Sequence, residues 1–325
     1  MIARAWADWE AFWDEREHPI SLVLVRILLG ACWLYDFVNI WRLRLVIPLF
    51  GVAEVGGFSD ALMRENTPWF YQLFPGTPLT ARLLHAAMTL AALCLTVGFG
   101  TRISAAVLLF CWATFVEVIP YADRGIDTLS RLTLIVLMFS QAGRAWSVDA
   151  LIRTGSFFGD GNSIPAWPRR MLILQLVLMY FSAGVSKVGL TWWPMGHFAA
   201  LYFALQDPAV AAWDFSYVRR QPFFLMTQIG SAGTMVYQWT YPMVLVLMWG
   251  ARTGRGGCAL QWAVRHRLEW VWIAIGGVFH GALAISMNLG IFPWAMLALY
   301  PIWVRPDEFL ALAERVRARF GTPAG

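Results

Sequence analysis

Residues 20–38 read ISLVLVRILLGACWLYDFV, an apolar run whose only charged residues are Arg26 and Asp36. A helix needs about 20 mainly apolar residues to cross the hydrocarbon core of a bilayer. We therefore expect this run to form a membrane-spanning helix. Asp36 would end it at the outer side, and Arg26 would reach the inner surface by extending its long side chain.

Seven further apolar stretches follow the first one. They cover residues 82–98, 103–119, 129–141, 171–187, 230–249, 270–287 and 291–304, and Pro293 suits the first turn of the last. The whole chain is 59% hydrophobic and only 14% charged, whereas a soluble domain carries about 25% charged residues. The sequence therefore predicts an all-α, polytopic transmembrane helical bundle of about eight spanning helices, folded as a single domain over residues 1–325.

The two ends of the chain predict amphipathic helices. In residues 1–19, Trp6, Trp9 and Trp13 share one helical face, which is typical of a helix lying in the membrane interface, although a frayed polar tail is an alternative. We expect no cleaved signal peptide, so the first span would direct insertion. Residues 306–325 place acids early and arginines late, as the helix dipole favours.

The distribution of arginines between the apolar stretches predicts the topology. Loops on the cytoplasmic side of a membrane are enriched in Lys and Arg. Arginines concentrate in the segments that lie inside if the N-terminus is inside, such as 142–170 and 250–269. We therefore expect a multi-pass protein of the plasma (inner) membrane with both termini cytoplasmic. Segments 41–80 and 188–228 would then be outer caps that lie against the membrane.

Composition also argues against other classes of protein. The net charge is +5, but the arginines lie between apolar runs, so we expect no nucleic-acid partner. The four cysteines show no Cys-x-x-Cys or Cys/His spacing, and we expect no metal. Besides the lipid bilayer, the partners that we expect are a secreted peptide or a small soluble protein.

Ionisable residues inside spanning helices are functional candidates, because burying them in lipid is costly. On this topology they gather toward the outer side; they are Asp36, His85, Glu117, Asp127, Arg131, Lys187 and His280. Structural interpretations stay open for several of them. Asp127 and Arg131 are spaced for an i,i+4 ion pair. Asp36 and Glu117 would mark helix ends, His85 would be an interfacial histidine, and His280 would be a hydrogen-bonded core residue.

Lys187 differs from the other candidates because it is the only lysine beside 24 arginines. Wherever this protein needs only a positive charge, it uses arginine. A desolvated amine can lose its proton and act as a base or nucleophile, whereas a guanidinium effectively cannot. We therefore expect Lys187 to have a chemical role, with a plain charged anchor as the alternative.

Several short motifs now carry a family resemblance. They are RILLG at 26–30 followed by Asp36, GFGTRIS at 98–104, WSVD at 146–149, QLVLMYFSAGVSKVGLTWWPMG at 175–196 and Phe279-His280. The longest contains the pattern Tyr-Phe-x-x-Gly-x-x-Lys ending at Lys187. In order and spacing these motifs resemble the HTTM domain of vitamin K-dependent gamma-carboxylase-like membrane proteins.

The resemblance implies a reaction and a site. In the carboxylases the lysine matching Lys187 is the base that deprotonates reduced vitamin K, and oxygen then forms the epoxide. The strongly basic intermediate removes a glutamate γ-proton, and the carbanion takes up carbon dioxide. The family faces this site away from the cytoplasm. Here, however, residues 124–127 read RGID where the carboxylases carry an Asn-His pair, and the large lumenal domain is not seen.

Two hypotheses follow from the residues and the resemblance together. In the first, the chain is a membrane enzyme that uses a reduced quinone, with Lys187 and His280 catalytic; its pocket would hold Asp36, His85, Glu117, Asp127, Arg131, Gln175, Tyr180 and Trp192. In the second, it is a non-catalytic partner that helps a secreted peptide mature or leave the cell, as short relatives do for a sporulation-delaying toxin. A transporter is the least favoured interpretation, because we find no paired broken helices.

Overall fold

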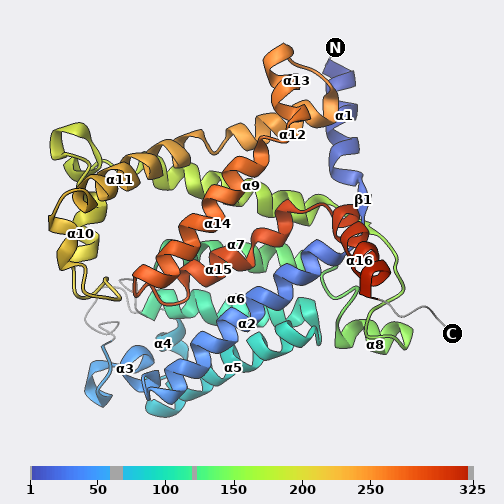
Figure 1. The fold of residues 1–325 in the computed structure, drawn as a ribbon. Helices are drawn as coiled ribbons and strands as arrows, with labels where there is room; N and C mark the ends of the chain where they lie inside the picture. Colours follow the sequence, from blue (N-terminus) through green and yellow to red (C-terminus); the bar gives the residue numbers. More distant parts are fainter. Residues whose placement is uncertain (1, 59–68, 119–122, 321–325) are drawn as a thin grey trace. The chain divides into compact units, whose positions relative to one another are not determined.

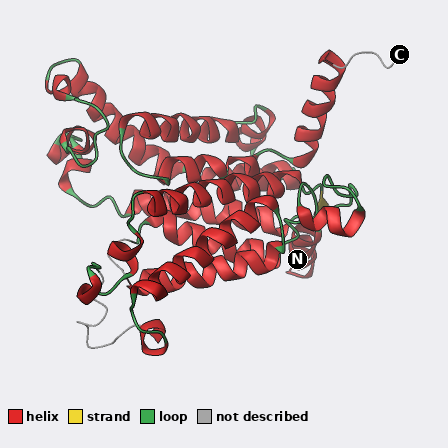
Figure 2. Ribbon diagram, turned by 90° about the horizontal axis from the view of Figure 1, so that it is seen from below, coloured by secondary structure: helices red, strands yellow, loops and turns green. Residues whose placement is uncertain are grey.

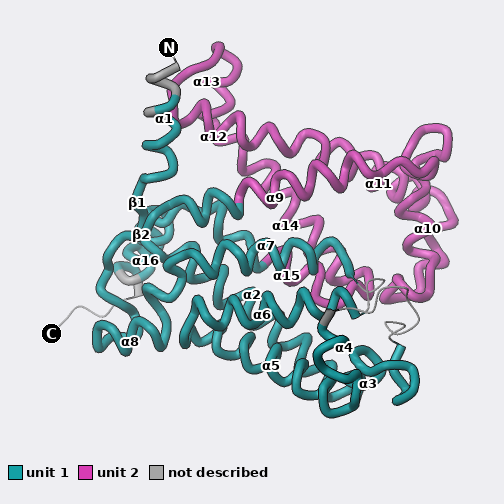
Figure 3. Tube along the Cα trace, turned by 180° about the vertical axis from the view of Figure 1, so that it is seen from behind, with its two compact units in different colours: residues 1–172, 298–325 teal, residues 173–297 magenta. Residues whose placement is uncertain are grey.

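The computed structural model describes residues 2–58, 69–118 and 123–320. Most of the described residues lie in helices, which confirms the all-α class. The chain divides into two compact units, coloured separately in Figure 3. Unit 1 comprises residues 1–172 and 298–325, and unit 2 comprises residues 173–297. Each unit is described by itself below.

Helices of unit 1 follow one another as packed neighbours. They are α1 (Ile2–Asp14), α2 (Ile20–Arg42), α3 (Val46–Phe50), α4 (Trp69–Leu73), α5 (Pro78–Val97), α6 (Thr101–Val118), α7 (Gly125–Phe139), α8 (Val148–Thr154) and α16 (Pro306–Phe320) (Figure 1). Helix α2 packs on α5, α5 on α6 and α6 on α7. Trp33 lies at the centre of this bundle: it is fully buried, meets Trp112 edge-to-face, and donates a hydrogen bond to Ser130 Oγ at 3.1 Å.

A short two-stranded sheet joins the N-terminal region to the stretch before α9. Strand β1 (Arg16–Glu17) pairs antiparallel with β2 (Ile164–Pro165). Beside it, Arg169 makes an ion pair with Glu17 at 2.7 Å and donates to the carbonyl of Ile302 at 3.0 Å. These contacts tie the two ends of unit 1 together. Figure 2 shows how little of the described chain lies outside helices.

Arg26 lies in the core of unit 1 rather than at its surface. Its side chain is fully buried, and its guanidinium donates to the carbonyls of Leu95, Thr96, Ala142 and Trp146. The expectation that Arg26 extends to the inner surface is therefore wrong. The reason is geometric: α5 and the loop after α7 end beside it, and their terminal carbonyls need donors.

The turn between α5 and α6 is built around this arginine. Gly98 ends α5 in the left-handed region (φ 71°), and a Cβ there would lie 2.5 Å from Arg26 Nη1. Asp149 holds the other side of the turn, because its carboxylate accepts hydrogen bonds from the amides of Gly100 and Thr101 at 2.7 and 2.8 Å. The motifs at 26–30, 98–104 and 146–149 therefore meet in one structural junction.

Unit 2 contains the second half of α9 (Trp167–Val185) and the helices up to α15. These are α10 (Ala200–Gln206), α11 (Phe223–Thr240), α12 (Met243–Thr253), α13 (Cys258–Arg265), α14 (Glu269–Ser286) and α15 (Phe292–Ala298). The segment after α10 is attached to the end of α14: Trp213 donates to the carbonyl of Ile285 at 2.7 Å, and Leu205, Val218 and Met287 form a small buried cluster.

Four helices of the described chain are long and apolar enough to cross a membrane: α2, α5, α6 and α14. They indicate a membrane protein, whereas the expected number of about eight spans is not confirmed. The stretch 230–249 was expected to form one helix. It forms parts of two, because α11 ends at Thr240 and α12 begins at Met243. Pro242 lies between them and has no amide hydrogen to continue the ladder. The stretch 291–304 is likewise divided, into α15 and a short turn of 3₁₀ helix at Tyr300–Trp303.

Both expected terminal helices are present. In α1, Trp6 and Trp9 are exposed by 62% and 54%, and α16 carries Asp307 and Glu308 in its first turn. Parts of other expected segments lie outside the described residues. These parts are residues 59–68 of the outer segment 41–80, residue 119 of the third span and residues 321–325 of the C-terminal tail.

Candidate functional site

A buried hydrogen bond joins two of the predicted site residues in unit 2. Tyr180 Oη lies 2.6 Å from His280 Nε2, with Tyr180 in α9 and His280 in α14. Tyr180 is 2% exposed and His280 is 1% exposed. A neutral imidazole has one donor and one acceptor nitrogen, so this pair can pass a proton between a phenol and an imidazole that are both shielded from water.

Aromatic rings enclose this pair. The ring of Tyr241 stacks on Tyr180 with centroids 4.2 Å apart, and Tyr237 meets Tyr180 edge-to-face at 5.4 Å. Phe279 and Phe292 contact the His280 ring at 5.1 and 5.5 Å. The surroundings are therefore largely apolar, which strengthens any hydrogen bond made inside them.

Among the described polar atoms of this region, His280 Nδ1, Gln238 Oε1 and Gln175 Oε1 are buried and make no hydrogen bond. A buried polar group left unsatisfied costs about 1–3 kcal/mol, so native proteins keep few of them. We call the group formed by Tyr180, Tyr237, Gln238, Tyr241 and His280 the Tyr–His cluster. Its unsatisfied imidazole and amide atoms are suited to a ligand that carries hydroxyl groups on an apolar body.

Lys187 lies just beyond the end of α9. Its ammonium donates to the carbonyl of Ala183 at 2.9 Å and lies 4.8 Å from the ring centroid of Trp192. The indole of Trp193 donates to the Lys187 carbonyl at 3.1 Å, which fixes the backbone. Within the described chain, no carboxylate lies within 4.0 Å of this ammonium. The lysine is thus half-buried against an indole and is not neutralised by an acid.

Gly184 lies between Tyr180 and Lys187 and allows α11 to approach α9. A Cβ at this position would lie 2.7 Å from Trp239 Cδ1 and 3.0 Å from Gln238 Cβ. Residues four apart face the same side of a helix, so Tyr180 and Gly184 face α11 together. This explains the Tyr-Phe-x-x-Gly-x-x-Lys pattern: the tyrosine binds the histidine, the glycine admits the neighbouring helix, and the lysine follows the helix end.

The predicted site residues of unit 1 form a separate polar group. Asp127 pairs with Arg124 at 3.0 Å and also accepts its backbone amide, as a capping box at the start of α7. Arg131 pairs instead with Asp123, through two hydrogen bonds of 2.8 and 2.9 Å. The i,i+4 pairing of Asp127 with Arg131 is therefore wrong, because each finds a partner in the residues just before α7.

Asp36 belongs to the same group. The hydrogen bond to Asp127 raises the pKa of Arg124 above its ordinary value, and the negative charges of Asp127, Asp36 and Asp123 add to that effect. Arg124 therefore stays charged and compensates the acids around it. At the end of α6, Glu117 is exposed, as expected of a residue that marks a helix end.

His85 lies in the core of unit 1. It is fully buried, and Phe37, Trp41 and Phe50 meet its ring edge-to-face at 5.8, 5.2 and 5.2 Å. Neither ring nitrogen has a hydrogen-bond partner. Helix α5 starts earlier than the apolar stretch suggests. Its cap is Thr77, whose hydroxyl accepts the amide of Thr80, so His85 lies two turns inside the helix.

The structure thus brings Tyr180 and His280 into contact, and Lys187 and Trp192 into contact, while Gln175 lies further back along α9. Sequence reasoning missed Tyr237, Gln238 and Tyr241 of the cluster. Their signal is the spacing of two tyrosines four residues apart around a glutamine in an apolar helix. Among the described residues, no group of three or more His, Cys, Asp or Glu side chains is placed to hold a metal ion.

Comparison with known proteins extends the resemblance seen in the motifs. The family model of the HTTM domain matches residues 15–307, which is most of the chain. No solved structure matches it. The match includes the Tyr-Phe-x-x-Gly-x-x-Lys pattern, the junction around Arg26 and both helices of the Tyr180–His280 pair. The chain belongs to the HTTM family of vitamin K-dependent gamma-carboxylase-like membrane proteins.

Proposed function

We propose that this chain is a membrane enzyme that accepts protons from a quinol-like aromatic substrate, with Lys187 as the base and the Tyr–His cluster as the binding site. The observation that carries the proposal is the buried 2.6 Å hydrogen bond between Tyr180 and His280. A reduced quinone bound there would supply the electrons for chemistry with oxygen. The protein's own residues bind its ring, orient its hydroxyl groups and hold the proton.

The cluster fits such a ligand on two grounds. Tyr237 and Tyr241 present aromatic faces and edges around Tyr180, which suit a flat ring. His280 Nδ1 and Gln238 Oε1 are buried and lack partners, so hydroxyl groups of a bound quinol would satisfy them. Because Tyr180 and His280 are almost fully buried, binding requires movement of the side chains that cover them.

Lys187 is suited to accept a proton because no carboxylate among the described residues stabilises its charged form. Tyr180 lies within α9, whereas Lys187 follows its end at Val185. The lysine and the Tyr–His pair are therefore distinct proton acceptors. An outward-facing position for both, in the plasma membrane with cytoplasmic termini, follows from the arginine distribution and is part of this proposal.

The test separates binding from chemistry. In purified full-length protein, reduced menadione should quench tryptophan fluorescence, and His280→Gln and Tyr180→Phe should weaken that binding about tenfold or more, the effect of losing one hydrogen bond in a dry site. Lys187→Arg should bind normally but oxidise the quinol at least a hundredfold more slowly. Unchanged binding by both cluster variants would refute the site, and full turnover by Lys187→Arg would refute the base.

A second candidate function, support of a secreted peptide, is favoured by the surface next to Lys187. Val188, Leu190 and Met195 are exposed by 79%, 65% and 79% in a segment without a spanning helix. On the expected topology these side chains face outward, where a peptide would meet them. If this function is correct, Met195→Glu should abolish co-purification with the peptide, and Lys187→Arg should have no effect. The enzyme hypothesis predicts instead that Lys187→Arg impairs function and that Met195→Glu does not.

A further inference from the structure

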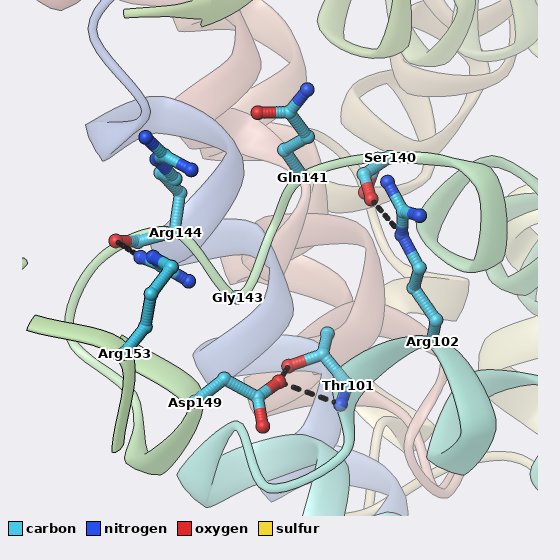
Figure 4. A pocket seen from close by; sticks show the side chains of 8 residues that line it. All are labelled: Thr101, Arg102, Ser140, Gln141, Gly143, Arg144, Asp149 and Arg153. Atoms are coloured by element: carbon cyan, nitrogen blue, oxygen red, sulfur yellow. Dashed lines mark hydrogen bonds between the residues drawn. The ribbon is translucent and has the colours of Figure 1, made fainter. Parts of the chain in front are cut away.

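A basic cavity lies at the opposite end of unit 1 from Asp36 and Asp127. Its volume is about 430 Å³, and it is formed where α6 begins, α7 ends and α8 follows (Figure 4). Arg102 comes from α6, Arg144 from the loop after α7, and Arg153 from α8. The cavity is separate from the Tyr–His cluster, which lies in the other unit, and none of these arginines has a role in the proposed reaction.

The three guanidinium groups have hydrogen-bonding capacity left for a ligand. Arg102 donates through Nε to the carbonyl of Ser140 at 3.0 Å, and Arg153 donates through Nη2 to the carbonyl of Arg144 at 2.8 Å. Arg144 contacts Asp160 at 3.2 Å through Nη2, while its Nε is buried and has no partner. Since each guanidinium carries five N–H donors, these contacts use only a part of them.

Among the described residues that line the cavity, one acid, Asp149, faces three arginines, so it offsets only a part of their charge. Both oxygens of Asp149 are engaged by the turn before α6: they accept from the amides of Gly100 and Thr101 and from the Thr101 hydroxyl at 2.7 Å. Figure 4 shows the Asp149 carboxylate directed at Thr101 and away from the side chain of Arg102. The cavity therefore keeps an excess of positive charge, which suits an anion.

Large apolar side chains are exposed on α8, which supplies Arg153 to the cavity, and in the loops on either side of α8. Ile152 and Phe158 are exposed by 70% and 67%, and Leu151, Phe157 and Trp146 are also exposed. Helix α8 and the loop after it thus combine arginines with exposed apolar groups, which is typical of a segment lying in the membrane interface. A free inorganic anion would need the arginines alone, whereas a lipid would use both features.

We propose that this cavity binds the phosphate group of an anionic phospholipid, with its acyl chains lying over Ile152 and Phe158. Arg102 and Arg153 contact the phosphate, and Arg144 adds a third positive charge to the lining. Guanidinium groups match phosphate through paired hydrogen bonds. On the topology expected from the arginine distribution, the lipid belongs to the cytoplasmic leaflet, where basic pockets beside spanning helices bind head groups.

The test is the thermal stability of the purified full-length protein in a neutral detergent. Dioleoylphosphatidylglycerol should raise Tm by about 3 °C at ten times its Kd, the size expected from ligand linkage for a chain of this length. Dioleoylphosphatidylcholine and inorganic phosphate at the same concentration should not. The double variant Arg102→Gln/Arg153→Gln should lose at least half of the shift. Arg42→Gln, at an exposed arginine of α2 far along the same unit, should keep it.

A second variant tests the cavity in case the double variant does not fold. Gln141→Glu leaves all three arginines in place but adds a carboxylate to the cavity lining, where it competes with phosphate. It should reduce the phosphatidylglycerol shift as the double variant does, without lowering the basal Tm. An equal shift with phosphatidylcholine, or an undiminished shift in both variants, would overturn the proposal. A full Tm shift with inorganic phosphate would show that the cavity binds anions in general and would refute the phospholipid as its specific ligand.

Discussion

Tyr180 and His280, one hundred positions apart in the chain, share a 2.6 Å hydrogen bond that is closed off from solvent. The bond fixes α9 and α14 relative to each other inside unit 2. The other imidazole nitrogen, His280 Nδ1, is buried and makes no hydrogen bond. Structure and proposed chemistry thus depend on the same two side chains.

Tyr180→Phe should lower Tm, because it removes the partner of His280 Nε2 and leaves that atom buried and unsatisfied. The expected loss is about 1–3 kcal/mol. Tyr35→Phe is the matched control, since Tyr35 is 65% exposed and its change should be silent. Thermal unfolding of the three proteins in one detergent measures the effect. If the two variants unfold alike, the hydrogen bond contributes nothing to stability.

His85→Phe should raise Tm. Both nitrogens of His85 are buried among Phe37, Trp41 and Phe50 without partners, and an apolar ring of similar shape has no such unsatisfied groups. His266→Phe serves as the control, because His266 is exposed. A lower Tm for His85→Phe would mean that the imidazole has a function or a ligand that its aromatic surroundings conceal.

Gly98→Ala should be much more destabilising than Gly100→Ala. Both glycines have positive φ, 71° and 53°, so both alanines carry the left-handed strain of about 1–2 kcal/mol. Only at Gly98 would the new methyl group also meet other atoms, Ser147 Cβ and, at 2.5 Å, Arg26 Nη1, and it would displace the guanidinium from its carbonyls. Expression level and Tm compare the two, and equal losses would show that the contact with Arg26 is unimportant.

Exchange of partners around α7 can be measured by double-mutant cycles. Arg124→Gln with Asp127→Asn should show a coupling energy of about 0.5–3 kcal/mol, as residues in contact do. Arg131→Gln with Asp127→Asn should be nearly additive, since Arg131 pairs with Asp123. A strong coupling in the second cycle would restore the i,i+4 pair that the sequence spacing suggests.

Stability should depend on pH through His18, which lies before the first spanning helix. Burial lowers the pKa of His18 below 6.5, and its Nδ1 accepts the amide of Ile20 at 3.3 Å. The unfolded chain therefore binds a proton more readily than the folded one. Stability should be unaffected above pH 6.5 and should fall as the pH drops below that value. In His18→Gln this part of the pH dependence should disappear; its persistence would assign the effect to another group.

Much of unit 1 follows from the sequence, because uninterrupted apolar runs become α2, α5 and α6 with small changes at their ends. This reasoning failed at Pro242. Hydropathy is averaged over many residues and hides a single proline, whereas the missing amide hydrogen of that proline interrupts the hydrogen bonds of the helix. The start of α5 was also missed, because the cap at Thr77 precedes the apolar stretch, and His85 therefore lies two turns inside the helix.

The candidate site was predictable only in part. Tyr180 and His280 were both named from the sequence, but their contact is a tertiary event that spacing along the chain does not encode. Asp127 and Arg131 have the spacing of an ion pair, and yet Arg124 and Asp123, from the residues just before α7, bind them instead. The sequence shows which charged residues are close enough along the chain to pair, but the pairs that form depend on the packing at the start of α7.

The carbonyls around Arg26 also have a consequence for biosynthesis. Helix α2, which is long and apolar enough to cross a membrane, leaves the ribosome with a charged guanidinium in its apolar run, which disfavours insertion when no partner is present. Those partners come from Leu95, Thr96, Ala142 and Trp146, all of which are synthesised much later. We therefore expect α2 to remain incompletely satisfied until the chain has been translated past residue 146. A nascent chain stopped before that point should be retained by membrane chaperones or degraded.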